Sequence, residues 1–371
     1  MCHDDVVVQP HEHLDATLIA ADTHVGDGEN SDPAQSRLDA QGWKYAVKRT
    51  LGDILPDGLL DLAALLTFFS LLSLAPALLL GYSIITLVLS SDSVEVLGRA
   101  RDLVSEYVPE EQAQVVLGVI DSVAGSATGG RVGIIVGLLV ALWTSSAYVR
   151  AFSRCANAVY GRTEGRGLLK QWGMMLLLNF GLLLGAIVIV VSWVLNEGLV
   201  MGLLGPIAQP LHLTSVLTFL TEQFLPIWVW VRWPVIVVVL IIFVATLYHW
   251  APNARPWKFR WLSTGSVFAI VGIIIVGGAL NLYFTVFAAF NAYGAVSSVL
   301  AIIIALWIFN TCLILGLKID VEIGRARQLK AGLPAEEHNL VPPRDIEAVT
   351  KLKQRQQRLV DEAKGLSSES D

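Results

Sequence analysis

The sequence predicts an all-α, polytopic membrane protein with six transmembrane helices and additional amphipathic helices. Its 371 residues are 54% hydrophobic and 16% charged, and the mean hydropathy is +0.60. A soluble domain of this length rarely has that composition. Several apolar runs contain about 18 residues or more, enough to cross a hydrocarbon layer about 30 Å thick. In addition, the connections between these runs are alternately rich and poor in Lys and Arg, as expected for a chain that crosses a membrane repeatedly.

Residues 1–42 are acidic and polar, with nine Asp and Glu residues and one basic residue, Arg37. Because no apolar periodicity is evident, we expect a disordered cytoplasmic tail. The segment lacks the basic and apolar regions of a signal peptide. Its histidines lie among carboxylates, but a disordered chain would have to be ordered to gather metal ligands. We therefore predict no metal site and no cofactor.

Residues 43–329 are expected to form the membrane domain, which begins with an amphipathic helix over residues 43–55. Lys44, Lys48 and Arg49 accompany its apolar positions, so the helix should lie on the cytoplasmic membrane face.

The first span, about residues 59–89, contains a single charge, Asp61, and Pro76 near its middle. Proline removes the N–H that would bond the carbonyl of Leu72, so the helix should kink there. The Ser73 hydroxyl is a candidate donor for that carbonyl. The kink either belongs to a working part of the protein or serves packing alone.

Residues 90–131 show apolar positions every three or four residues, which predicts two short amphipathic helices outside the bilayer. They form either a lid or a static cap.

Five further apolar runs complete the six spans. Gly181 and Gly185 place two small residues on one helix face, which favours close helix packing. Arg232, near the outer end of its span, either extends toward the interface or faces a pathway. The expected boundaries of these spans are about 132–151, 174–195, 227–248, 265–287 and 295–317.

The short connections on alternate sides of the predicted spans are rich and poor in Lys and Arg. This pattern places both termini in the cytoplasm. Residues 330–371 are expected to be a polar cytoplasmic tail with a short helix around residues 346–360.

Several motifs together resemble the YihY/BrkB family of bacterial inner-membrane proteins, which have often been mislabelled ribonuclease BN. The resemblance covers residues 43–329. After Gly316 the family usually has an acidic or amide residue, whereas this chain has Lys318, followed by Asp320 and Glu322. The matching positions include Ser73 and Pro76 in the first span, Asn157, Tyr160 and Gly161 after the second, and then Tyr248, Pro252, Asn253, Tyr283, Tyr293 and Gly294.

The resemblance implies a multi-pass protein of the bacterial inner membrane, with transport or envelope roles proposed for relatives. Polar groups inside the spans also favour a transporter-like or permease-like protein that contacts membrane lipids and moves a small molecule or lipid. A non-catalytic envelope scaffold is the alternative. Nuclease activity and nucleic-acid binding are not expected, because no cluster of metal ligands or acid–base pairs accompanies a basic groove. No catalytic residues are predicted. The residues proposed for a pathway or for helix packing are Asp61, Ser73, Pro76, Asn157, Asn179, Arg232, Tyr248, Pro252, Asn253, Tyr283, Tyr293, Gly294, Asn310, Asp320 and Glu322.

Overall fold

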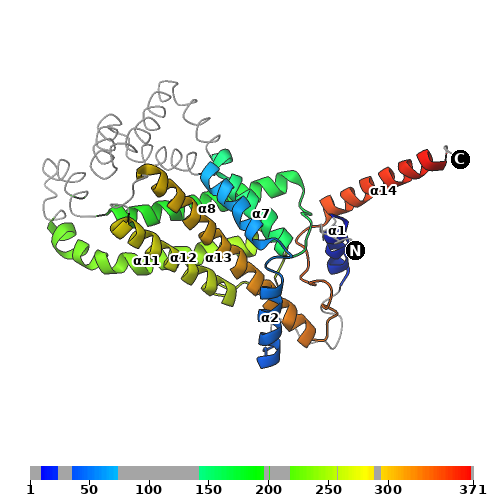
Figure 1. The fold of residues 1–371 in the computed structure, drawn as a ribbon, viewed down its shortest axis with the longest axis horizontal. Coiled ribbons are helices and arrows are strands. Elements are labelled where there is room, and N and C mark those ends of the chain that lie inside the picture. The colour runs from blue at the N-terminus through cyan, green and yellow to red at the C-terminus, as the bar shows by residue number, and fades with distance from the viewer. Residues whose placement is uncertain are drawn as a thin grey trace, which may run out of the picture.

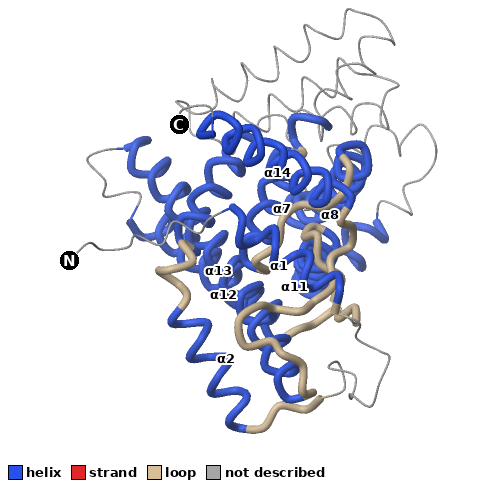
Figure 2. The backbone as a smooth tube through the Cα atoms, turned by 90° about the vertical axis from the view of Figure 1, so that its right-hand side faces the viewer, coloured by secondary structure: helices blue, strands red, loops and turns tan. Residues whose placement is uncertain are grey.

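The computed structural model describes residues 10–23, 36–73, 142–195, 200, 218–256, 258–287 and 294–368. Within these ranges every regular element is a helix, and Figure 2 shows helices joined by loops. The all-α fold class is therefore confirmed for the described part of the chain.

Four of the described helices are long and apolar enough to cross a membrane. They span Leu168–Ser192, Phe219–Trp250, Thr264–Val286 and Val299–Lys330, and they correspond to the third to sixth predicted spans. The first predicted span contains the apolar helix Leu59–Ser73, and its remainder, with Pro76, lies outside the described residues. Most of the second span and both amphipathic helices expected over residues 90–131 also lie outside them. The count of six spans stays a prediction.

The long helices cover the predicted spans and extend beyond several of their ends. Figure 1 shows the four long helices crossing the same body of the molecule. Among the described elements, the most extensive contacts join α12 to α13, α2 to α13 and α8 to α11. The bounds are α8 Leu168–Val194, the π-helix η2 Phe219–Phe224 leading into α11 Leu225–Trp250, α12 Thr264–Leu282 leading into the π-helix η3 Tyr283–Phe287, and α13 Gly294–Lys330.

The last long helix, α13, continues well beyond the predicted end at residue 317. Its 37 residues correspond to a length of about 55 Å, so part of it must project from a bilayer core. The helix α2, Ala40–Gly52, packs on this extension, where Ala46 contacts Ile323 and Ala326. An amphipathic helix is predicted at this place, and it is present. Its residues Trp43, Val47 and Leu51 are exposed.

The helix α7, Ala147–Val159, extends past the predicted end of the second span at residue 151. Its side chains are largely buried, and Phe152, Cys155 and Ala156 belong to the main hydrophobic core. Because small and apolar residues cover most of its surface, α7 can be surrounded by other helices.

The N-terminal tail is predicted to be disordered, and this is wrong for the helix α1, Pro10–Asp22. Leu14, Ala16 and Ala20 are buried. The backbone amide of Thr163 donates to the Thr17 hydroxyl at 2.9 Å. The helix is thus held by groups about 146 residues away, which a local pattern does not reveal.

The C-terminal tail is partly a packed segment. Leu333, Ala335 and Leu340 form a small core, and the backbone amide of Leu340 donates to Oε1 of Gln328 at 2.9 Å. The predicted polar tail from residue 330 thus includes a packed segment that the sequence pattern does not indicate. A helix is expected near residues 346–360, and α14, Glu347–Ser368, extends away from the bundle (Figure 1).

Candidate functional site

A pocket is lined by the end of α11, the loop after it, the start of α12 and the C-terminal third of α13. The cavity has a volume of about 130 Å³. Aliphatic, tyrosine and charged side chains contribute to its wall. We refer to it as the α11–α13 pocket, and the residues that define it are Tyr160, Tyr248, Ser263, Leu317, Asp320 and Arg327.

Asp320 ties α13 to the start of α12 at this pocket. Its Oδ1 accepts a hydrogen bond from the backbone amide of Gly265 at 2.8 Å, and its Oδ2 accepts one from the Ser263 hydroxyl. Ser263 is also the N-cap of α12, and its hydroxyl accepts from the backbone amide of Ser266 at 3.1 Å. Serine is a favoured N-cap because its oxygen satisfies an otherwise unpaired helix amide. Each oxygen of Asp320 therefore already has a protein donor.

Two glycines allow α12 and α13 to approach each other beside the pocket. A Cβ atom on Gly265 would collide with the backbone carbonyl of Gly316, and one on Gly316 would lie 2.6 Å from the Tyr248 hydroxyl. That hydroxyl donates to the carbonyl of Leu313 at 2.6 Å. The Tyr248 ring is stacked on Phe152, with 6.3 Å between ring centroids. Tyr248, a predicted site residue, thus joins α11 to both α13 and α7.

Basic side chains dominate the charged part of the pocket. Lys258 and Arg260, from the α11–α12 loop, are exposed, and Arg327 is half-buried. Arg260 and Arg327 interact electrostatically with Asp320. The Nε atom of Arg327 is buried and has no hydrogen-bond partner among the described residues. The basic residues in the lining outnumber its one carboxylate, and this balance of charge favours an anion.

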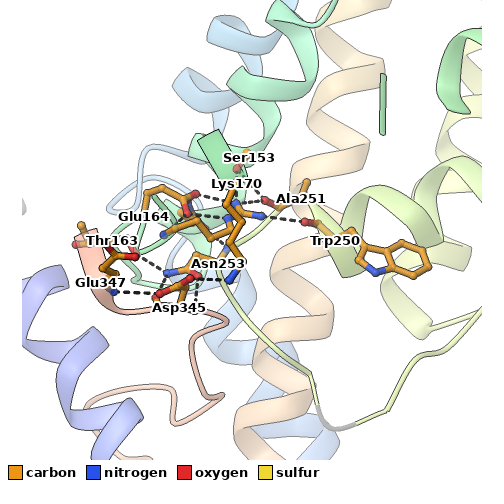
Figure 3. A network of polar contacts seen from close by, with 11 residues as sticks. Ser153, Thr163, Glu164, Lys170, Trp250, Ala251, Asn253, Asp345 and Glu347 are labelled. Carbon is orange, nitrogen blue, oxygen red and sulfur yellow. Dashed lines mark hydrogen bonds and ion pairs between the residues drawn. The ribbon is translucent and has the colours of Figure 1, made fainter. Parts of the chain in front are cut away.

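A second polar network joins the α11–α12 loop to α7 and to the segment before α14 (Figure 3). The Asn253 backbone amide donates to Oδ1 of Asn157 at 2.6 Å. Its side chain donates to the carbonyls of Thr163 at 3.1 Å and Asp345 at 3.0 Å, and it accepts from the Asp345 amide at 3.1 Å. Pro252 beside it is buried. Both asparagines and Pro252 are predicted site residues, and the network gives Asn157 and Asn253 structural partners.

Arg166 extends this network. Its Nε and one terminal nitrogen each lie 2.7 Å from a different oxygen of Glu164, and it also donates to the Ala251 carbonyl at 2.8 Å. The Arg166 side chain is 2% exposed and that of Glu164 is 21% exposed, so the guanidinium of this bidentate pair is shielded from water. In the sequence Arg166 is only one base in a connection, and Glu164 is not among the predicted site residues, because neither residue has a local signal for the pairing.

Arg162 is a second buried arginine in the same connection. It donates to the carbonyls of Ala16 at 2.6 Å and Val341 at 3.0 Å, and thereby holds both terminal segments. Burial, assisted by the nearby Arg325, lowers the pKa of Arg162 to about 10. The connection predicted as a basic loop is thus an anchoring point for the chain ends.

A polar cluster around Asn310 lies inside the apolar bundle. The Tyr148 hydroxyl donates to Oδ1 of Asn310 at 3.0 Å, and Nδ2 of Asn310 donates to the hydroxyls of Thr67 at 3.2 Å and Ser70 at 3.3 Å. The Ser73 hydroxyl accepts from the Tyr148 backbone amide at 3.2 Å. The predicted residues Ser73 and Asn310 are therefore brought together, and Tyr148 joins them without having been predicted.

Asn179 makes a smaller polar contact between α8 and the residues before α7. Its Nδ2 donates to the Ser145 hydroxyl at 2.8 Å and to the Leu142 carbonyl at 3.3 Å. Neither of these hydrogen bonds reaches the Asn310 cluster, and both connect α8 to the residues before α7.

The sequence groups Lys318, Asp320 and Glu322 together, but the structure divides them between two faces of α13. Asp320 binds the start of α12, as described above. Lys318 lies 2.9 Å from Glu322 and 2.8 Å from both Asp53 and Asp57. An i,i+4 spacing places Lys318 and Glu322 on one helix face, whereas Asp320 lies on another. The ionic group holds the α2 segment and not the pocket.

The other predicted residues that the structure describes lie at separate positions. Asp61 is exposed, and the Arg232 guanidinium lies 5.5 Å from the centroid of the Trp233 ring. Tyr283 begins η3, and Gly294 begins α13. Pro76 and Tyr293 lie outside the described residues.

No group of three or more His, Cys, Asp or Glu residues in the described ranges is arranged to hold a metal ion.

Comparison with known proteins supplies a family and one curated relative. A family model described as virulence factor BrkB matches residues 50–340. The chain is also 28% identical over 275 residues to YfkH of Bacillus subtilis (strain 168), a protein named as putative ribonuclease-like. That match covers 72% of this chain and 90% of the relative. No solved structure matches.

Proposed function

This chain belongs to the BrkB family, and we propose that it is a transporter-like or permease-like protein. The family and the apolar helices together indicate an integral membrane protein. Its location in this proposal is the bacterial inner membrane, with both termini in the cytoplasm. The membrane lipids are its surroundings, and its substrate is a lipid or another envelope-related small molecule.

The observation that carries this proposal is a succession of polar contacts along α13. It begins at Asp320 in the α11–α13 pocket, continues through the Tyr248 bond to Leu313, and reaches Asn310. Ten residues of helix separate Asp320 from Asn310, about 15 Å along the axis. Polar groups inside a membrane usually face each other, water or a substrate. Such a succession is suited to a pathway that leads from the pocket into the bundle.

The test compares two amides in neighbouring helices. Asn310→Leu removes the centre of the buried cluster, whereas Asn281→Leu changes an exposed amide on α12. Lipid and metabolite contents on the two sides of the membrane would first identify a candidate substrate in cells with and without the protein. Purified protein would then be assayed in proteoliposomes with that compound.

We expect transport by the wild type and by Asn281→Leu, and a loss in Asn310→Leu at unchanged insertion and thermal stability. Transport that survives in a folded Asn310→Leu protein would contradict a pathway along α13.

An envelope scaffold is the second candidate, and α14 favours it. This helix is exposed over most of its length and presents Leu352, Leu359 and Leu366 to solvent. Deletion of residues 347–371 separates the two functions, because a scaffold should lose its cellular role while transport in proteoliposomes should persist.

The ribonuclease-like name belongs to the relative and does not extend to this chain. Phosphodiester hydrolysis needs clustered metal ligands or an acid–base pair beside a basic groove. In the α11–α13 pocket the carboxylate of Asp320 is already bonded through both oxygens. We propose that this chain is not an enzyme, and a nuclease assay of the purified protein would test that statement.

A further inference from the structure

A group of aromatic rings lies at the end of α11 and in the α11–α12 loop, which contributes Lys258 and Arg260 to the pocket. The Trp250 and Phe259 ring centroids are 5.2 Å apart, and those of Phe259 and Trp261 are 4.9 Å apart. Trp261 is exposed. Exposed tryptophan next to an apolar span is characteristic of the membrane–water interface, where head groups lie. Such a position is typical of residues at the depth of the lipid head groups.

The wall of the pocket is amphiphilic. Leu317 and Val321 contribute apolar surface from α13, and Ala245 contributes it from α11. Arg260, Lys258 and Arg327 contribute positive charge. A cavity of about 130 Å³ is about ten times the space that a single water requires. It is large enough to accept the polar end of a ligand, with an apolar wall beside it.

The arginines are better suited to a ligand than to the protein around them. Asp320 already receives donors from Ser263 and Gly265, and its single negative charge is shared between Arg260 and Arg327. The buried Nε atom of Arg327 lacks a hydrogen-bond partner in the described part of the chain. A buried unsatisfied donor costs free energy unless something binds it. Guanidinium groups recognise phosphate oxygens through two parallel hydrogen bonds.

We propose that the α11–α13 pocket binds the phosphate group of an anionic ligand through Arg260 and Arg327, with Lys258 adding positive charge. The chemistry is that of a phosphate ester, either on a membrane lipid or free in solution. This inference rests on the proposed function, because it names the class of substrate that would enter the pathway along α13.

The experiment uses the full chain in a neutral detergent and three probes. These are a short-chain phosphatidic acid, the matching zwitterionic phosphatidylcholine, and inorganic phosphate, each titrated calorimetrically. The variants are Arg260→Gln, which is at an exposed position, and Arg327→Gln, with Arg327→Lys as the charge-preserving form. Arg255→Gln is the control, because Arg255 is an exposed base in the same loop but outside the pocket lining.

We expect the wild type and Arg255→Gln to bind phosphatidic acid with equal affinity. Arg260→Gln should bind it about tenfold more weakly, since one charge-assisted contact is lost, and Arg327→Lys should recover part of the loss seen in Arg327→Gln. Phosphatidylcholine should bind more weakly than phosphatidic acid. Saturable binding of inorganic phosphate with the same variant dependence supports a free phosphate as the source, and lipid binding without it supports a lipid.

An equal loss in Arg255→Gln and Arg260→Gln would overturn the site, because general surface charge would then explain the binding. Absence of binding by both anionic probes would overturn it as well. The proposed function fails separately. If the protein binds phosphatidic acid but moves no substrate in proteoliposomes, the phosphate site is supported and the transporter proposal fails. If transport occurs and is insensitive to Arg260→Gln, the transporter proposal is supported and the phosphate site fails.

Discussion

The Lys318 ammonium lies 2.9 Å from the Glu322 carboxylate, and the two side chains are only 5% and 2% exposed. The same ammonium contacts Asp53 and Asp57 at 2.8 Å each. Arg49 approaches Glu322 from α2 at 3.3 Å. One buried cation on α13 therefore neutralises carboxylates from two parts of the chain.

Lys318→Met should lower the free energy of unfolding by about 3 kcal/mol, because breaking a buried pair leaves carboxylates without their cation. Lys330→Met is the control, since Lys330 forms an exposed pair with Asp39 at 3.3 Å, and it should change stability by less than about 1 kcal/mol. Denaturant titration in a neutral detergent measures both. Equal effects of the two substitutions would show that the buried group does not hold the α2 segment.

The contact between Gly265 and Gly316 predicts that the stability of the protein depends strongly on side-chain size at these positions. Gly265→Ala should destabilise the protein by about 1–3 kcal/mol, because overpacking forces the two helices apart. Gly277 lies in the same helix, and a Cβ atom added to it would meet nothing within 4 Å, so Gly277→Ala should be neutral or slightly stabilising. Thermal unfolding of the two variants provides the comparison. A harmless Gly265→Ala would exclude the close approach of α12 and α13.

The membrane helices could be predicted because their signal is local. The runs that form α8, α11 and α12 are apolar over most of their length, and burial in lipid requires little more than that. The C-terminal end of α13 was harder to predict. Its extension beyond Leu317 is stabilised by partners of Lys318 that lie more than 260 residues earlier in the chain. Composition indicates where a helix enters the apolar layer of the membrane, but it does not indicate where that helix ends in water.

The site was predictable only in part. The resemblance to a family identified Tyr248 and Asn253, and polarity inside a span identified Asn310. In the sequence Arg327 is only a base after the sixth span, since its place in a pocket depends on the fold of three helices. The separation of Lys318 from Asp320 could have been predicted from the helical periodicity, because residues two positions apart lie on different faces of a helix.

The Arg166 network predicts that a conservative substitution will not preserve it. Arg166→Lys should lose the bidentate bond to Glu164, because a lysine offers a point charge and not a planar pair of donors. We expect a loss of about 2–4 kcal/mol in the unfolding free energy, since Glu164 and the Ala251 carbonyl lose buried donors.

Arg255→Lys, at an exposed position in the α11–α12 loop, is the control and should leave stability unchanged. Denaturant titration of both variants tests this, and wild-type stability of Arg166→Lys would show that charge alone is sufficient.

Acid should weaken the attachment of the segment before α14. Lys170 lies 2.7 Å from Asp345, and this bond, with the Glu347 backbone amide, lowers the pKa of Asp345 below its usual 3.8. The carboxylate therefore contributes stability above the pKa of the unfolded chain and loses it as pH falls through the lower pKa of the folded protein. Because the Lys170 side chain is 66% exposed, the contribution should be below about 1 kcal/mol.

Asp345→Asn removes the titration while keeping the shape of the side chain. The difference in unfolding free energy between the wild type and this variant should be constant from about pH 7 to pH 5 and should shrink as the pH falls below 3.8 and through the lower pKa of the folded protein. Urea titrations at several pH values measure it. A difference that grows on acidification would mean that the folded protein raises the pKa of Asp345, and the Lys170 contact would then not be the cause of its stability.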